Sequence, residues 1–294
     1  MAIATEKSLP TEAVQAIQDY VVDNFQQKLV GRQVLFRTDV GAEKTTYKYY
    51  RIDSEMINAQ VIAPKGSFPR EDLRKLEELV DTIKKIGLGF DISREDYMQQ
   101  NWVNRSVREI TYKVAKKEDD TIINGDADYN IKGIADVYGN ETTSTGGVWS
   151  DASSSGAMPT NDLITAIGDL QQNSGFRFGN DPKDLVLLLN PQNKTELMQK
   201  FHDEDKQRAL PFFTDLLGAV ITSPSVVEGT GYLMETGLDI ARLVLAEDIT
   251  VESPVYNIDN QSWQGNIFTR SLPVFLQYGS VAGKTTAIQK IGTI

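Results

Sequence analysis

Residues 93–124 read SREDYMQQNWVNRSVREITYKVAKKEDDTIIN and contain neither glycine nor proline. Ser93 can cap a helix at this point, with Asp96 in the capping-box position. A helix of roughly 28 residues would be about 40 Å long, well above the usual length in a globular protein. The sequence therefore predicts one long, straight helix as the dominant element of the chain.

The side chains of this helix divide into a narrow apolar stripe and a basic side. Apolar residues fall within roughly 60° of one another: Val103, Val107, Ile110 and Val114. Basic residues lie opposite them: Arg105, Arg108 and Lys116. Glu118, Asp119 and Asp120 follow at the negative end of the helix dipole, so we expect them to pair with Lys or Arg from elsewhere.

Upstream of this helix, residues 10–30 predict a short amphipathic helix, and residues 34–38 and 45–52 predict two strands joined by a turn. Residues 59–63 are a candidate third strand. In the second strand Tyr47, Tyr49 and Arg51 share one face, and Lys48 and Tyr50 share the other. Because both faces mix aromatic groups with charge, the pattern favours a projecting hairpin with partners on both sides. An irregular edge hairpin on a domain surface is the alternative.

Residues 70–86 predict a helix that ends at Gly87. Residues 139–160 are rich in Gly, Ser and Thr and mark a domain boundary. Helices at 160–173 and 190–201 and strands at 185–189, 219–222 and 231–234 then predict an α/β region. Strands at 251–256, 267–270, 274–278 and 285–291 predict a return to β structure.

The composition excludes several classes of function. The 294 residues include 30 bases and 41 acids, and a net charge of −11 disfavours nonspecific binding to nucleic-acid phosphates. The absence of Cys excludes disulfides and thiolate metal sites, and the single histidine, His202, excludes multi-histidine sites. We therefore expect no catalytic residue, no metal and no cofactor, and the sequence gives no support to an enzyme. No secretory signal and no apolar run of about 20 residues is present, so we expect a soluble protein made in a cytoplasm.

Five motifs in this order carry a resemblance to a known family. They are ISREDY at 92–97, EDDTIINGD at 118–126, LLLNPQ at 187–192, LGAVITSPS at 217–225 and AIQKI at 287–291. Their order and spacing resemble the capsid fold shared by the major capsid proteins of tailed phages and archaeal viruses and by encapsulins. The resemblance implies an α+β fold with an N-terminal arm, an extended β-hairpin loop, a peripheral domain with a long spine helix and an α/β axial domain. It implies the boundaries 1–31 for the arm, 32–70 for the loop, 71–134 for the peripheral domain, 135–238 for the axial domain and 239–294 for the peripheral return strands.

The resemblance also implies a function, as a shell subunit. The extended loop would contact adjacent subunits through a set of residues in 34–51: Val34, Phe36, Arg37, Lys44, Tyr47, Lys48, Tyr49, Tyr50 and Arg51. Many copies would close an icosahedral viral capsid around double-stranded DNA held without sequence-specific binding, with possible portal, scaffold or decoration proteins and no membrane. The location would then be the virion, assembled in the host cytoplasm. An encapsulin shell holding cargo enzymes in the cytoplasm is the alternative, and a soluble α/β enzyme or binding protein is a third reading.

Overall fold

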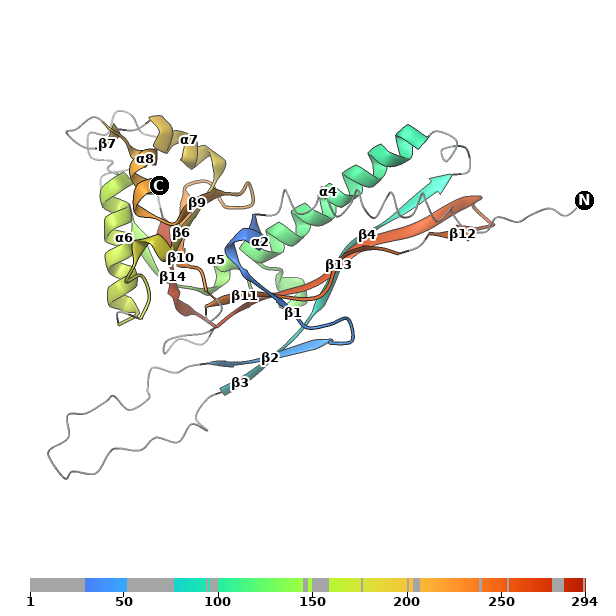
Figure 1. Ribbon diagram of the computed structural model, residues 1–294, viewed down its shortest axis with the longest axis horizontal. Helices are drawn as coiled ribbons and strands as arrows, with labels where there is room; N and C mark the ends of the chain where they lie inside the picture. The colour runs from blue at the N-terminus through green and yellow to red at the C-terminus, as the bar shows by residue number, and fades with distance from the viewer. Residues whose placement is uncertain are drawn as a thin grey trace, which may run out of the picture.

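The computed structural model shows two β-sheets, each with helices packed on it, and a separate two-stranded hairpin (Figure 1). It describes residues 30–51, 77–93, 95, 100–144, 148–149, 159–175, 177–199, 201–202, 207–237, 240–252, 254–276, 283–292 and 294. Of residues 100–106, 201–202 and 207–208 only the backbone is described. The predicted helix at 10–30 and the candidate strand at 59–63 lie outside these residues.

The first sheet is built around β13 (Ser262–Phe275). One edge of β13 pairs with β4 (Lys84–Ser93), and the other pairs with β11 (Ala241–Val251) and β12 (Val255–Asn257), all antiparallel. The short strand β1 (Phe36–Asp39) adds to β11 in parallel. This sheet therefore joins segments from the first third of the chain to segments from its last quarter.

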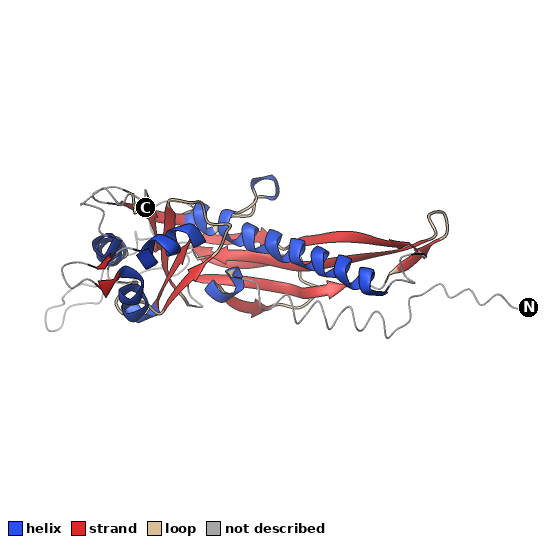
Figure 2. Cartoon of the chain, turned by 90° about the horizontal axis from the view of Figure 1, so that it is seen from above, coloured by secondary structure: helices blue, strands red, loops and turns tan. Residues whose placement is uncertain are grey.

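The long helix α4 (Gln100–Asn124) lies along one face of the first sheet (Figure 2). Val107 and Val114 of α4 pack with Phe90, Ile92 and other buried residues of the sheet. The helix ends where Gly125 takes a φ of +77°, the left-handed conformation that commonly stops a helix. Ser93, the predicted cap, is the last residue of β4, and Asp96 of the predicted capping box lies outside the described residues.

The second sheet has the order β5-β14-β10-β6-β9. Its strands are β5 (Tyr138–Thr143), β6 (Leu185–Leu189), β9 (Ala219–Thr222), β10 (Thr230–Glu235) and β14 (Thr285–Gly292). The five residues of β6 are all buried because the strand is central and both faces of the sheet are covered. Helices α6 (Pro159–Asn173), α7 (Pro191–Gln199) and α8 (Ala209–Leu216) supply the apolar cover of one face.

Short elements complete the described chain. They are α2 (Gly31–Val34), the 3-10 helices η2 (Ala127–Tyr129) and η3 (Pro182–Asp184), α5 (Ile134–Val137), and the paired strands β7 (Phe201–His202) and β8 (Gln207–Arg208). His202, the single histidine of the sequence, lies in β7.

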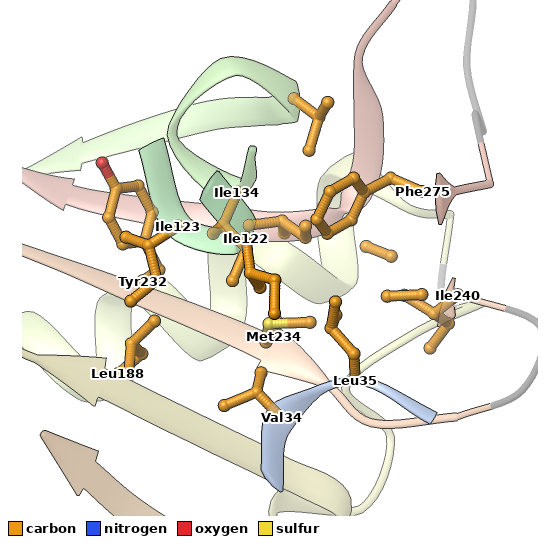
Figure 3. Packing of buried hydrophobic residues seen from close by; sticks show 14 of the residues in the cluster. Val34, Leu35, Ile122, Ile123, Ile134, Leu188, Tyr232, Met234, Ile240 and Phe275 are labelled. Carbon is orange, nitrogen blue, oxygen red and sulfur yellow. The ribbon is translucent and has the colours of Figure 1, made fainter. Parts of the chain in front are cut away.

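A shared hydrophobic core joins the two sheets (Figure 3). Ile122 and Ile123 at the end of α4 meet Tyr232 and Met234 of β10 in this core, and Leu35 packs into it from the segment after α2. Burial of such side chains contributes roughly 1.5–3 kcal/mol each. The end of the long helix is therefore fixed against both sheets.

The predicted helix at 70–86 is wrong. Its described part forms β3 (Glu77–Thr82) and the start of β4, and Gly87 lies inside β4 instead of ending a helix. Ile86, Leu88, Phe90 and Ile92 alternate along β4, and this period of two was the signal for a strand.

The predicted strands near the C-terminus also differ from the observed ones. The strands expected at 267–270 and 274–278 are one continuous strand, β13. The strand expected at 251–256 is divided between the end of β11 and the start of β12, and most of β11 was not predicted. Strand β14 lies in the second sheet, not with β11–β13, because it pairs with β10 and β5.

Candidate assembly surfaces

The two-stranded hairpin consists of β2 (Thr46–Arg51) and β3 (Glu77–Thr82), paired antiparallel from Thr46 opposite Thr82 to Arg51 opposite Glu77. Exposure alternates along β2, as the sequence predicted for its two faces. The partner differs from the prediction, because the first predicted strand, β1, pairs with β11 and the hairpin forms with β3.

The inner face of the hairpin packs on the chain's own first sheet. Tyr47 and Tyr49 contact a cluster that includes Val244 and Leu272, on the side of the sheet away from α4. The hydroxyl of Tyr47 accepts a hydrogen bond from Arg242 Nη1 at 3.0 Å. This face is therefore occupied within one subunit.

Tyr49 also donates a hydrogen bond from its hydroxyl to Asp81 Oδ2 at 2.7 Å. Burial, followed by this hydrogen bond, raises the pKa of Tyr49 well above its usual value. The hydroxyl remains protonated, and it joins β2 to β3 on the inner face.

The outer face of the hairpin consists of Lys48 and Tyr50 from β2 and Glu78 and Val80 from β3. Lys48 Nζ pairs with Glu78 Oε1 at 2.6 Å, and the hydrogen bond to Glu78 raises the pKa of Lys48. Tyr50 is 50% exposed and Val80 is 51% exposed. Two apolar side chains beside an ion pair form a surface of the kind that another protein chain can cover.

The structure separates four of the predicted loop residues from this hairpin. Val34 is 2% exposed at the end of α2 and lies in the shared core, so its prediction as an inter-subunit residue is wrong. Phe36, which is exposed, and Arg37 lie on β1 in the first sheet. Lys44 lies in the turn before β2, where its carbonyl accepts a hydrogen bond from Arg270.

Arg51 completes β2, and its Nη1 pairs with Glu77 Oε2 at 3.4 Å. With Tyr47, Lys48, Tyr49 and Tyr50, it belongs to the five predicted residues that the structure brings together on one strand.

The described part of the α4 stripe faces the first sheet. Val107 and Val114 are buried, and the half-buried Ile110 packs beside them. Arg108 and Lys116 are exposed on the other side. The side chains of Val103 and Arg105 lie outside the described residues.

The acidic end of α4 belongs to a buried polar junction that we define as Arg32, Glu118, Asp119, Ser223 and Asp248. Arg32 donates from Nε to Glu118 Oε2 at 3.0 Å and from Nη1 to Asp248 Oδ1 at 2.7 Å. The Glu118 side chain is 0% exposed. The predicted pairing of these acids with a distant cation is therefore confirmed for Glu118.

Asp119 uses neutral donors instead of a cation. Its carboxylate accepts the backbone N–H of Gly31 at 2.5 Å and the Ser223 hydroxyl at 2.8 Å. Burial raises the pKa of Asp119 despite these hydrogen bonds. The third acid, Asp120, accepts a hydrogen bond from Asn124 one turn later on the same helix.

The pKa of Asp248 shifts in the opposite direction. Burial would raise its pKa, but the hydrogen bond and charge of Arg32 outweigh burial, and the net shift is downward. Arg32, Ser223 and Asp248 were not predicted, because no local pattern marks residues that meet α4 from opposite ends of the chain.

Within the described ranges, no group of three or more His, Asp or Glu residues could hold a metal ion. Of the helices that the structure describes, none is long and apolar enough to cross a membrane.

Solved structures share this arrangement over almost the whole chain. The virus-like particle from Pyrococcus furiosus matches with a TM-score of 0.67 at 10% identity, over 96% of this chain and 98% of that chain. The capsid of the native GTA particle matches with a TM-score of 0.64 at 10% identity, over 99% and 93%. The capsid of Myoviridae phage XM1 matches with a TM-score of 0.63 at 11% identity, over 92% of each chain. The predicted capsid fold is confirmed over almost the whole chain.

The sequence identifies the family within this class. The chain belongs to the Linocin_M18 family, described as encapsulating protein for peroxidase, and the match covers residues 5–256. No curated protein matches the sequence. The fold and the family are those of structural shell proteins.

Proposed function

We propose that many copies of this chain assemble into a closed icosahedral shell. The observation that carries the proposal is the capsid fold over almost the entire chain. Identical subunits close a shell when each presents a surface that fits a different surface on its neighbour. The first sheet with α4 would form the peripheral domain, and the second sheet with α6–α8 would form the axial domain at the five-fold and six-fold axes.

The outer face of the hairpin is the contact that we assign to a neighbouring subunit. Its inner face already packs on the first sheet, so Tyr50 and Val80 are the apolar side chains left for an external partner. The exposed side of α4, which carries Arg108 and Lys116, is a second candidate surface.

The contents of the shell have two candidates. Double-stranded DNA, with the virion as the location, is supported by the likeness to phage capsids. A cargo enzyme in a cytoplasmic shell is supported by the family description, which rests on sequence over residues 5–256. Portal, scaffold or decoration proteins would accompany the first candidate.

Assembly is tested with the double variant Tyr50→Ser, Val80→Ser. Particles are measured by size-exclusion chromatography and negative-stain microscopy, with Tyr50→Phe as the matched control because it retains the ring. We expect the control to form shells and the double variant to remain as folded subunits or small capsomers. Normal shell yield from the double variant would show that this face is not an inter-subunit contact.

The contents are tested on native particles treated with nuclease. Protected DNA in the particles supports the viral capsid, and a second, stoichiometric protein identified by mass spectrometry supports the cargo shell. A chain that remains monomeric or dimeric at all concentrations, without shells, tubes or rings, would contradict the shell function.

A further inference from the structure

Strand β4 provides a long open edge of the first sheet. Its ten residues all pair with β13 on one side, and no described residue pairs with its backbone on the other side. Gly87, Leu88 and Gly89 are exposed at the centre of the strand, with Leu88 42% exposed. The other edge strands of the two larger sheets have only three to six residues.

The centre of this edge lacks the usual protection against pairing with another chain. Proteins protect edge strands with short length, charge, proline or a bulge. Residues 86–90 contain no charge and no proline, and the register with β13 runs without a shift. Lys85 is directed onto its own sheet, where its Nζ pairs with Glu252 at 3.1 Å and lies 3.5 Å from the Phe268 ring centroid. A regular unpaired edge of this kind accepts an added strand.

The sequence of β4 is complementary to itself in one antiparallel register. When Leu88 of one copy lies opposite Leu88 of another, Lys85 opposes Asp91 and Ile86 opposes Phe90. Asp91 is exposed and has no hydrogen bond or ion pair within the described part of the chain. A shift by two residues in either direction places Lys85 opposite an uncharged residue, so the charges favour this register.

We propose that β4 pairs with β4 of a second copy across a two-fold axis at Leu88. The contact would form roughly eight to ten backbone hydrogen bonds. It would place Lys85 of each copy opposite Asp91 of the other on one face, where Lys85 is 49% exposed and would turn from Glu252 to Asp91. The two Leu88 side chains would lie on the other face, which carries α4. The contact is isologous, and a two-fold axis of this type occurs in icosahedral shells. The proposal rests on the shell function proposed above and adds to it the partner of this edge.

Cysteine variants test the register, because the chain has no cysteine of its own. In assembled particles, Leu88→Cys would place two Cβ atoms about 4.5–5.5 Å apart, close to disulfide distance. Lys85→Cys alone would place its two thiols roughly 20 Å apart, six residues along the strand. The double variant Lys85→Cys, Asp91→Cys would again bring thiols opposite each other.

We expect oxidised Leu88→Cys particles to give a disulfide-linked dimer on a non-reducing gel. Lys85→Cys particles should give no such dimer, and the double variant Lys85→Cys, Asp91→Cys should give the dimer again. Hydrogen exchange of amides 86–90, measured in unsubstituted shells and dissociated subunits, supplies a readout that needs no substitution. Protection in shells without a Leu88 dimer would show that another segment covers the edge and would overturn the proposal. Intact shells with neither dimer nor protection would overturn it while the shell function stands. If the unsubstituted chain never assembles, the shell function fails, and this proposal fails with it.

Discussion

Arg32→Ala removes the only cation that the described structure pairs with the buried carboxylate of Glu118. Arg32 donates to both oxygens of Glu118, at 3.0 and 3.3 Å, and the other hydrogen bond of that carboxylate comes from the Thr269 hydroxyl at 3.4 Å. Breaking a buried ion pair from one side costs about 3–5 kcal/mol, because the remaining charge is left uncompensated. For 294 residues the unfolding entropy is about 0.6 kcal/mol/K, so Tm should fall by about 5–8 °C.

The assay is thermal unfolding of dissociated subunits at pH 7, followed by circular dichroism. Arg37→Ala is the matched control, because Arg37 is 49% exposed and also pairs with Asp248, at 3.0 Å. An exposed pair contributes about 0–1 kcal/mol, so the control should lose less than about 2 °C. Replacing both partners, Arg32→Met with Glu118→Leu, should recover most of the loss because the buried carboxylate of Glu118 is no longer left without its cation. Equal losses from Arg32→Ala and Arg37→Ala would refute this reasoning.

Three further substitutions test other parts of the fold. Burial raises the pKa of Asp119 above its value in the unfolded chain. The free energy of unfolding of the wild type, relative to that of Asp119→Asn, should therefore increase as the pH falls from 7 towards 4. Urea titrations measure this difference, and a difference that stays constant with pH would contradict the prediction. Trp149→Phe removes the indole N–H that donates to buried Asp162 at 2.9 Å and should cost about 1.5–3 kcal/mol in urea unfolding, and an unchanged midpoint would argue against it. Gly125→Ala forces a side chain at φ +77° against backbone atoms and should cost about 2–4 kcal/mol, whereas Gly168→Ala, with open space in α6, should cost nothing. Equal effects of the two glycine changes in thermal unfolding would contradict the strain at Gly125.

Elements with a strong local pattern could be predicted from the sequence. The apolar run 185–189 is β6, and the amphipathic stretch 160–173 is α6 within one residue. The helix predicted at 70–86 failed because Leu76, Val80 and Ile83 also satisfy a helical spacing. The alternation that begins at Ile86 was the competing signal.

The two surfaces of β2 could be predicted because the pleat of a strand is a local property. The strand that pairs with β2 could not, since β3 follows only after residues 52–76. The polar junction is a stronger case, because Arg32 and Asp248 are separated by 216 positions and no periodicity relates them. The sequence signal for this junction is the run of three adjacent acids in a helix, because buried acids cannot all remain unpaired.

The pairing of β1 with β11 has a consequence for the order of events on the ribosome. Translation at about 5–20 residues per second puts roughly ten to forty seconds between the synthesis of Arg32 and that of Asp248. For nearly all of this interval the first sheet lacks β11, and throughout it lacks β13, so β4 has no partner strand within the nascent chain. The hairpin face and the β4 edge that we propose as subunit contacts therefore reach their folded positions only when synthesis is nearly finished, because β13 is among the last elements to be made.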